Sequence, residues 1–317
     1  METFTIKNKH LSISCLNYGA AMTSLIVKDK LGKEINVIYG FKDPKDYDHN
    51  TYYLGAAVGR IAGRIGGGGF TLNEVFYPLY NDNGVHLHGG TEGFSFRDWE
   101  LEEITEGEQP EITLKRSSEN MEDGYPGNLE VSVTYKLIDN KLSIRFTAES
   151  DQDTYVNFTN HNYYNLAGEG SILDQELYMD AASWQEKDEK NLATGKLLDV
   201  TNTPFDFRSP RNVGSHPDFK GIDDCFSLGD EEVSAGLYSP ESGIEMKVYT
   251  NQAAVVVFTP ETIDKKEYLN PDPGTYPAIC FETQGFNNAP NKPEFPSILL
   301  KKGERYINES VYEFNIR

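Results

Sequence analysis

The chain has few basic residues relative to its acidic ones and no local basic cluster. Its 317 residues carry 29 Lys and Arg against 50 Asp and Glu, for a formal net charge of −21. Affinity for nucleic acid depends on Lys and Arg that neutralise phosphates, and a chain this acidic would need a strong basic patch. The sequence therefore argues against a nucleic-acid-binding protein.

Long apolar runs and paired cysteines are absent as well. The longest strongly apolar run, residues 253–258, is far shorter than the roughly 20 residues of a membrane-spanning helix. The N-terminus alternates polar and apolar residues, unlike a signal peptide. Cys15, Cys225 and Cys280 are widely spaced without a CxxC pair, which disfavours a disulfide framework. We expect a cytoplasmic protein with no membrane partner.

Sustained helical periodicity is nearly absent, whereas alternation of period 2 recurs. Residues 129–137 and 142–148 alternate apolar and polar side chains, as half-buried strands do. Further short runs rich in β-branched and aromatic residues occur at 112–114, 248–250, 253–259, 279–283 and 311–316. The segments 43–53 and 181–190 could each hold a short helical turn.

No linker or fixed-period repeat divides the chain, so we expect one domain over residues 1–317. A single twisted sheet of so many strands would curl or split. The pattern therefore predicts an all-β fold, a large antiparallel β-sandwich.

A glycine-rich segment, VGRIAGRIGGGGF, contains Arg60 and Arg64. It has neither the GxxxxGK[ST] nor the GxGxxG pattern of phosphate-binding loops. A planar guanidinium in such a connection can instead bind neutral hydroxyls or carboxylates. Solvation at the surface is the alternative for either arginine.

Two histidines stand two residues apart in NDNGVHLHGGTEG, so on an extended segment His86 and His88 would face the same side. With Glu92 they partly resemble the HxHxxxE metal-binding motif of the cupins, and His161 with Asn165 imitates the second cupin motif. A metal site remains an alternative.

Two later segments place polar groups on strand faces. In TYVNFTNHNYYNLAG, an extended backbone would align Asn157, Thr159 and His161, which favours a hydrated cavity over a core. In AICFETQGF, Glu282 lies within an apolar strand, where burial would raise the pKa of its carboxyl towards neutrality and suit it to act as a general base. A solvent-facing Glu282 is the alternative.

Taken together and in order, these segments resemble the aldose 1-epimerase (galactose mutarotase) family. The chain resembles seven sequence motifs of this family. VGRIAGRI resembles GR-x-A-x-RI, VHLHGGTEGF resembles NHLHGG-x-x-GF, EDGYPGNLEVSVTYKL resembles DG-x-x-GFPG-x-L, and TNHNYYNLAG resembles T-x-H-x-YFNL-x-G. TPFDFR resembles TPfDFR, GIDDCFSL resembles GYDH-x-F-x-L, and AICFETQGF resembles LE-x-Q. The resemblance implies a β-supersandwich and interconversion of the α and β anomers of free aldoses. It implies no cofactor and no metal.

The resemblance also implies roles for particular residues. Mutarotation removes the proton of the C1 hydroxyl and delivers one to the ring oxygen, so it needs a base and an acid together. Glu282 matches the family's base and His161 its acid. The sugar-binding positions match His88, Arg64, Asp223 and Gln284.

Three positions depart from the family pattern and leave the preferred sugar open: Gly63 and Val85 stand where many members have Asn, and Asp224 replaces a His. A hexose-6-phosphate 1-epimerase is an alternative, for which Arg60 is the only obvious spare cation. A non-catalytic carbohydrate-binding or sensor protein is another. The sequence implies a small-molecule sugar as substrate and sets no oligomeric state.

Overall fold

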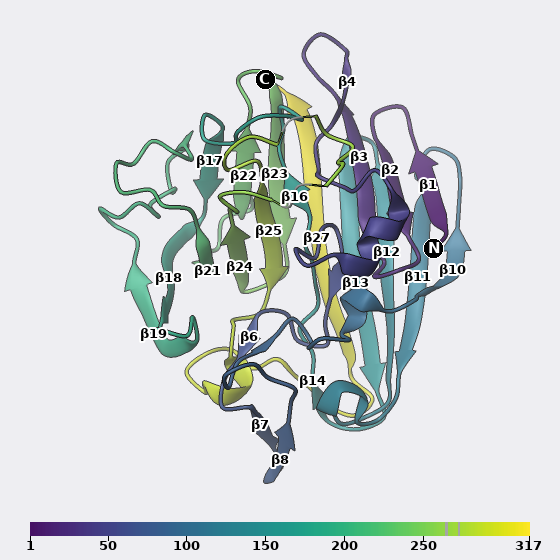
Figure 1. Ribbon diagram of the computed structural model, residues 1–317, viewed down its shortest axis with the longest axis vertical. Helices are drawn as coiled ribbons and strands as arrows, with labels where there is room; N and C mark the ends of the chain where they lie inside the picture. The colour runs from purple at the N-terminus through teal and green to yellow at the C-terminus, as the bar shows by residue number, and fades with distance from the viewer. Residues whose placement is uncertain (264–265, 272) are drawn as a thin grey trace.

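Three antiparallel sheets make up most of the computed structural model, which describes residues 1–263, 266–271 and 273–317 (Figure 1). The largest has nine strands, in spatial order β10 (Glu100–Ile104), β11 (Glu111–Ser118), β12 (Leu129–Ile138), β13 (Lys141–Ser150), β27 (Arg305–Ile316), β23 (Ile244–Thr250), β22 (Ala235–Tyr238), β17 (Glu176–Met179) and β20 (Arg211–Asn212). A six-stranded sheet has the order β16 (Tyr163–Tyr164), β25 (Ile279–Gln284), β24 (Ala254–Phe258), β21 (Asp223–Leu228), β18 (Ala181–Lys187) and β19 (Ala193–Asp199). The four-stranded sheet consists of β1 (Thr3–Lys7), β2 (Ser12–Leu16), β3 (Met22–Lys28) and β4 (Glu34–Asn36).

Short two-stranded ladders and single helical turns complete the structure. The ladders pair β15 (Thr159–Asn160) with β5 (Ala57–Val58), β6 (Arg64–Ile65) with β9 (His86–Leu87), β7 (Gly69–Leu72) with β8 (Val75–Pro78), and β14 (Thr154–Tyr155) with β26 (Leu299–Leu300). The 3₁₀ turns are η1 (Pro44–His49), η2 (Phe94–Phe96), η3 (Glu122–Gly124) and η4 (Ala289–Asn291).

The prediction of an all-β fold is confirmed, and each of the expected strands overlaps an observed one. The turn expected at 43–53 is present as η1. The helical turn expected at 181–190 is wrong, because residues 181–187 form β18, which is hydrogen-bonded to β19 and β21. Ladder pairing on both sides outweighs the weak local preference of this segment.

The main core lies between the nine-stranded sheet and the other two. It combines Val133 and Tyr312 of the nine-stranded sheet with Ile279 and Phe281 of β25. All three cysteines are free and buried, which agrees with the expected lack of disulfides. No helix in the described part of the chain has the length and apolarity needed to cross a bilayer.

Polar side chains of β27 fix β25 against the large sheet. Asn308 donates to the carbonyl of Thr283 at 2.8 Å, and the Tyr312 hydroxyl donates to the carbonyl of Phe281 at 3.3 Å. The hydroxyls of Thr283 and Ser310 are 2.6 Å apart. Because side chains alternate along a strand, the side chain of Glu282, which lies between Phe281 and Thr283, points away from β27.

Candidate active site

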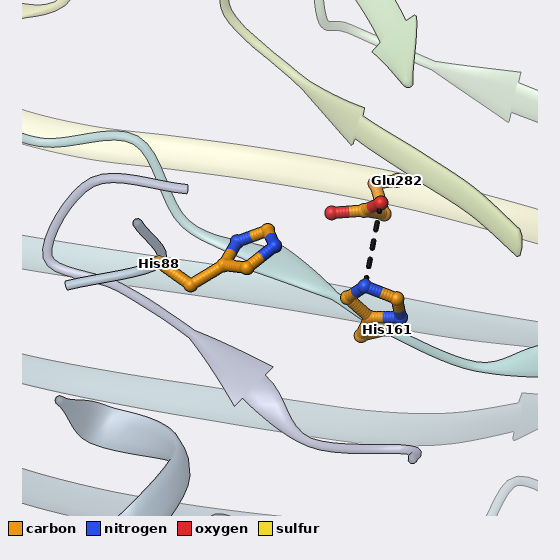
Figure 2. A group of neighbouring side chains, drawn as sticks. All are labelled: His88, His161 and Glu282. Carbon is orange, nitrogen blue, oxygen red and sulfur yellow. Dashed lines mark ion pairs between the residues drawn. The ribbon is translucent and has the colours of Figure 1, made fainter. Parts of the chain in front are cut away.

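A pocket of about 150 Å³ lies on the side of β25 that faces away from β27. Six of its lining residues carry polar or charged groups used below: Arg64, His88, His161, Asp223, Glu282 and Asn287. They come from β6, β21, β25 and three connecting segments, so the pocket is assembled from distant parts of the chain. Figure 2 shows the side chains of His88, His161 and Glu282 converging there.

Glu282 is buried in the middle of β25, opposite Val256 of β24. Burial, with a smaller contribution from the negative charge of Asp223, raises the pKa of its carboxyl from 4.5 to about 8, while the positive charge of Arg64 opposes the rise. Its Oε2 atom is buried and has no hydrogen-bond partner within the described residues. This carboxyl therefore holds its proton at neutral pH and can release it only slightly above neutrality, which suits it to proton transfer.

His161 follows β15, and its backbone is fixed on both sides. Its N–H donates to the carbonyl of Ala56 and its carbonyl accepts from the N–H of Gly55, each at 3.0 Å. The imidazole stacks on Tyr163, with ring centroids 5.1 Å apart. Its Nε2 lies 3.5 Å from Oε1 of Glu282 (Figure 2). Burial lowers the pKa of His161 to about 4.

His88 completes the cluster from the loop after β9. Its Nδ1 accepts a hydrogen bond from the backbone N–H of Gly63 at 3.2 Å. Burial and the neighbouring His161 and Arg64 hold the pKa of His88 well below 6.5, so the ring is neutral. A neutral imidazole that accepts at Nδ1 carries its hydrogen on Nε2, which makes His88 a donor at that atom.

Arg64 and Asp223 form an ion pair at the pocket. Nη2 of Arg64 lies 3.3 Å from Oδ2 of Asp223, and the two side chains are 24% and 36% exposed. Arg64 is placed by the pairing of β6 with β9, and Asp223 begins β21. A guanidinium and a carboxylate in contact with solvent offer several donors and acceptors to a polyhydroxylated ligand.

Gln284 was expected to contact the sugar directly, but the structure places it behind the wall of the pocket. Its side chain is fully buried and does not line the pocket. Its Nε2 donates instead to Oδ1 of Asn287 at 3.0 Å and to the carbonyl of Gly285 at 3.2 Å. Alternation along β25 placed Gln284 on the same face as Glu282, but the loop after the strand covers it.

The cupin-like ligand set is not assembled. Nδ1 of His86 lies 2.7 Å from the carbonyl of Tyr80, and its Nε2 lies 2.6 Å from the hydroxyl of Tyr125. Glu92 forms an ion pair with Arg97 at 2.9 Å. The expectation that His86 and His88 face the same site is therefore wrong.

A different trio would supply ligands if a cation bound, since one atom each of His88, His161 and Glu282 lie within 4.8 Å of one another.

Only one of the three departures from the family pattern lines the pocket, namely Gly63. Asp224 is buried and its Oδ1 lies 2.9 Å from Nζ of Lys187. Val85 pairs through its backbone with Asp82. These two positions therefore act on the sugar at most through other residues.

Arg60 lies outside the pocket. Its guanidinium is buried, donating to the carbonyl of Pro126 at 2.8 Å and to the hydroxyl of Ser118 at 2.7 Å. Arg60 is a structural residue and no spare cation for a phosphate.

Sequence reasoning did not single out the aromatic lining or Asn287. Tyr53, Tyr163 and Phe258 pack around His161, with centroid separations of 6.0, 5.1 and 6.4 Å. Tyr163 could have been found from its spacing of two residues from His161 on an extended segment. Tyr53 and Asn287 lie in loops, where no periodicity indicates direction.

Solved structures of similar architecture place this fold in a known class. A homologue of the GalM/aldose epimerases from C. elegans has a TM-score of 0.92 and 28% identity, covering 99% of both chains. Galactose 1-epimerase from Lactobacillus acidophilus NCFM has a TM-score of 0.87 and 28% identity, covering 98% of this chain and 93% of that one. The fold is that of the galactose mutarotase-like proteins.

Sequence comparison defines the family. The aldose 1-epimerase family model matches residues 2–313. The galactose mutarotase of Sus scrofa is 36% identical over 329 residues, covering 100% of this chain and 94% of that protein. The aldose 1-epimerase of Escherichia coli K12 is 31% identical, covering 97% and 93% respectively. The chain belongs to the aldose 1-epimerase family, and it is an isomerase of that family.

Proposed function

We propose that this protein interconverts the α and β anomers of free aldohexoses by acid–base opening and closing of the sugar ring. The observation that carries the proposal is the 3.5 Å approach of His161 Nε2 to Glu282 Oε1 in a pocket that also presents the Arg64–Asp223 pair. A proton acceptor and a proton donor must act on two oxygens of the same sugar, and these two groups are close enough to do so.

The mechanism divides the work between two groups that together hold one proton. Glu282 accepts the proton of the C1 hydroxyl, and His161 delivers a proton to the ring oxygen, so that the C1 to ring-oxygen bond breaks and a free aldehyde forms. Rotation about the C1–C2 bond followed by the reverse transfers closes the ring as the other anomer. With pKa values of about 8 and about 4, the pair holds one proton over the intervening pH range, mostly on Glu282. The reactive form is the one in which this proton has moved across the 3.5 Å contact to His161, which leaves Glu282 ionised as the base and His161 charged as the acid.

The remaining polar groups orient the sugar. His88 donates from Nε2 towards the ring oxygen, and Arg64 with Asp223 binds hydroxyls so that the reacting oxygens meet Glu282 and His161. Positioning of this kind can account for a large part of the rate enhancement, because opening and closing the ring needs only proton transfers from correctly placed groups.

The proposal is tested by following fresh α-galactose and α-glucose by polarimetry, or anomer exchange by NMR across a panel of sugars. We expect the protein to accelerate exchange and Glu282→Gln to abolish the acceleration. A wild-type rate equal to that of buffer for every common aldose would refute it. Exchange should persist after dialysis against a chelator, and a loss restored by added metal would favour the metal-site alternative.

The two alternatives make different predictions. Among the described residues that line the pocket, Arg64 is the one Lys or Arg, and it is already paired with Asp223, which disfavours a hexose 6-phosphate. Faster exchange of glucose 6-phosphate than of glucose would favour the phosphate alternative. Binding of sugar without turnover would favour a sensor. A cytoplasmic location stays a prediction, supported by the three unpaired buried thiols.

A further inference from the structure

The loop after β25 places an amide in a space that Gly63 leaves empty. Asn287 lines the pocket, and its Oδ1 lies 1.8 Å from the position that a Cβ atom on residue 63 would occupy. Gly63 adopts φ +78°, a conformation that favours glycine. Any side chain at residue 63 would therefore displace the amide of Asn287 from its present position against Gly63.

Asn287 is held rigidly by two buried glutamines. Its backbone N–H donates to Oε1 of Gln185, and Nε2 of Gln185 donates to its carbonyl, each at 3.1 Å. Oδ1 of Asn287 accepts from Nε2 of Gln284 at 3.0 Å. Gln185 is 1% exposed and Gln284 is fully buried, so water does not compete for their hydrogen bonds to Asn287.

The hydrogen bonds also settle which atom of the Asn287 amide is free. The end of Gln284 that meets Asn287 also lies 3.2 Å from the carbonyl of Gly285, so that end must be the NH₂ group. It can meet only an oxygen of Asn287. The Nδ2 group of Asn287 is then left without a hydrogen-bond partner in the described part of the chain, as a donor at the pocket.

We propose that Asn287 is a substrate-binding and specificity-determining residue, whose Nδ2 group donates a hydrogen bond to a sugar hydroxyl in the pocket that Arg64 and Asp223 also line. Gln284 is the positioning residue that orients this amide. The absence of a side chain at Gly63 is what makes room for it. The inference rests on the proposed binding of aldohexoses in this pocket.

The first experiment compares Asn287→Ala with the wild type and with Asn212→Ala, a control at an exposed asparagine on β20. A hydrogen bond between neutral groups predicts a drop in kcat/KM for galactose or glucose of about 3- to 10-fold. Because the hydroxyl does not react, the drop is expected in KM, with kcat changed less than about twofold. The melting temperature should stay within about 2 °C of the wild type. Activity of Asn287→Ala within twofold of the wild type for both sugars would overturn the inference.

A panel of 2-, 3-, 4- and 6-deoxygalactose locates the hydroxyl. For the sugar that lacks it, Asn287→Ala and the wild type should have equal kcat/KM, while the other three retain the 3- to 10-fold difference. A difference of the same size for all four sugars, or a parallel loss of kcat and melting temperature, would indicate a structural role and refute direct binding.

The shared space is tested by the pair Gly63→Asn and Gly63→Asn/Asn287→Ala. Asn tolerates positive φ better than most residues, so the single variant should suffer mainly from the clash with Asn287. We expect the double variant to exceed the single Gly63→Asn variant in kcat/KM by at least about threefold. Equal activities would contradict the shared space.

A binding measurement separates failure of this inference from failure of the proposed function. If the wild type exchanges no anomers but binds galactose by calorimetry, the proposed function fails, and Asn287→Ala should still raise Kd about 3- to 10-fold while Asn212→Ala does not. An unchanged Kd overturns the inference alone. No binding of either sugar overturns both.

Discussion

Replacement of Glu282 by Gln should abolish anomer exchange and, at alkaline pH, stabilise the fold. The folded pocket raises the pKa of this carboxyl from 4.5 to about 8, so folding favours its protonated form. The unfolded chain loses the proton near pH 4.5, whereas the folded chain keeps it until about pH 8. Between these values the unfolded state binds fewer protons, so the stability of the wild type falls as the pH rises.

The size of this effect follows from the two pKa values. At 1.36 kcal/mol per pH unit, the change from 4.5 to about 8 corresponds to about 5 kcal/mol once the pH exceeds 8, and to about 1 kcal/mol at pH 5. Gln cannot ionise, so its own packing and hydrogen-bonding changes add a contribution that does not vary with pH. The free energy of unfolding of Glu282→Gln minus that of the wild type should therefore increase by about 4 kcal/mol between pH 5 and pH 9.

The assay is urea unfolding at pH 5, 7 and 9, with stability extrapolated linearly to water. Glu149→Gln, at an exposed position on β13, is the control, and its difference from the wild type should be flat over this range. A difference for Glu282→Gln that is also flat, or that decreases with pH, would refute the raised pKa. The assignment of Glu282 to proton transfer would then rest only on its 3.5 Å contact with His161.

Three further outcomes are expected. The rate of anomer exchange should be level between about pH 5 and 7 and should fall above about pH 8 and below about pH 4. The His161–Glu282 pair loses its single proton above the first of these limits and gains a second proton below the other. A profile centred on pH 9 would contradict this. Asp223→Asn removes a negative charge that raises the pKa of Glu282, so the alkaline fall should move to lower pH and KM should rise, as a pH series of kcat and KM would measure. Arg60→Met leaves the carbonyl of Pro126 and other buried acceptors unpaired, so urea unfolding should show a loss of about 2–4 kcal/mol, whereas kcat per folded molecule should stay within about twofold.

The strands could be predicted where one face is buried against a core. Residues 142–148 lie in the middle of a sheet with β12 and β27 as neighbours, so their alternation records directly which side chains are buried. The segment 181–190 could not be predicted, because β18 is held in its sheet by β21, a strand that lies further along the chain, as well as by β19 after the turn. Its own residues carry only a weak preference.

The candidate site could likewise be predicted from the sequence only in part. Glu282 and His161 each lie in a sequence motif that resembles the family, and the tertiary structure brings Oε1 of Glu282 within 3.5 Å of Nε2 of His161. His86 and His88 are two residues apart, yet His88 has φ +50°, and this change of backbone direction sends the two rings to different partners. Spacing rules assume a regular backbone, and they fail where it turns.

By itself, the sequence determined the all-β class, the order of the motif boxes and the residue types for acid–base chemistry, because alternation and composition are local properties. Only the tertiary structure decided that Glu282 is buried, that Arg60 serves the fold while Arg64 meets Asp223, and that Gln284 stands behind Asn287. Burial and pKa depend on neighbours far away along the chain, as His161 is for Glu282 and Asp223 is for Arg64, whereas the contact of Gln284 with Asn287 depends on the path of a loop. No local pattern records them.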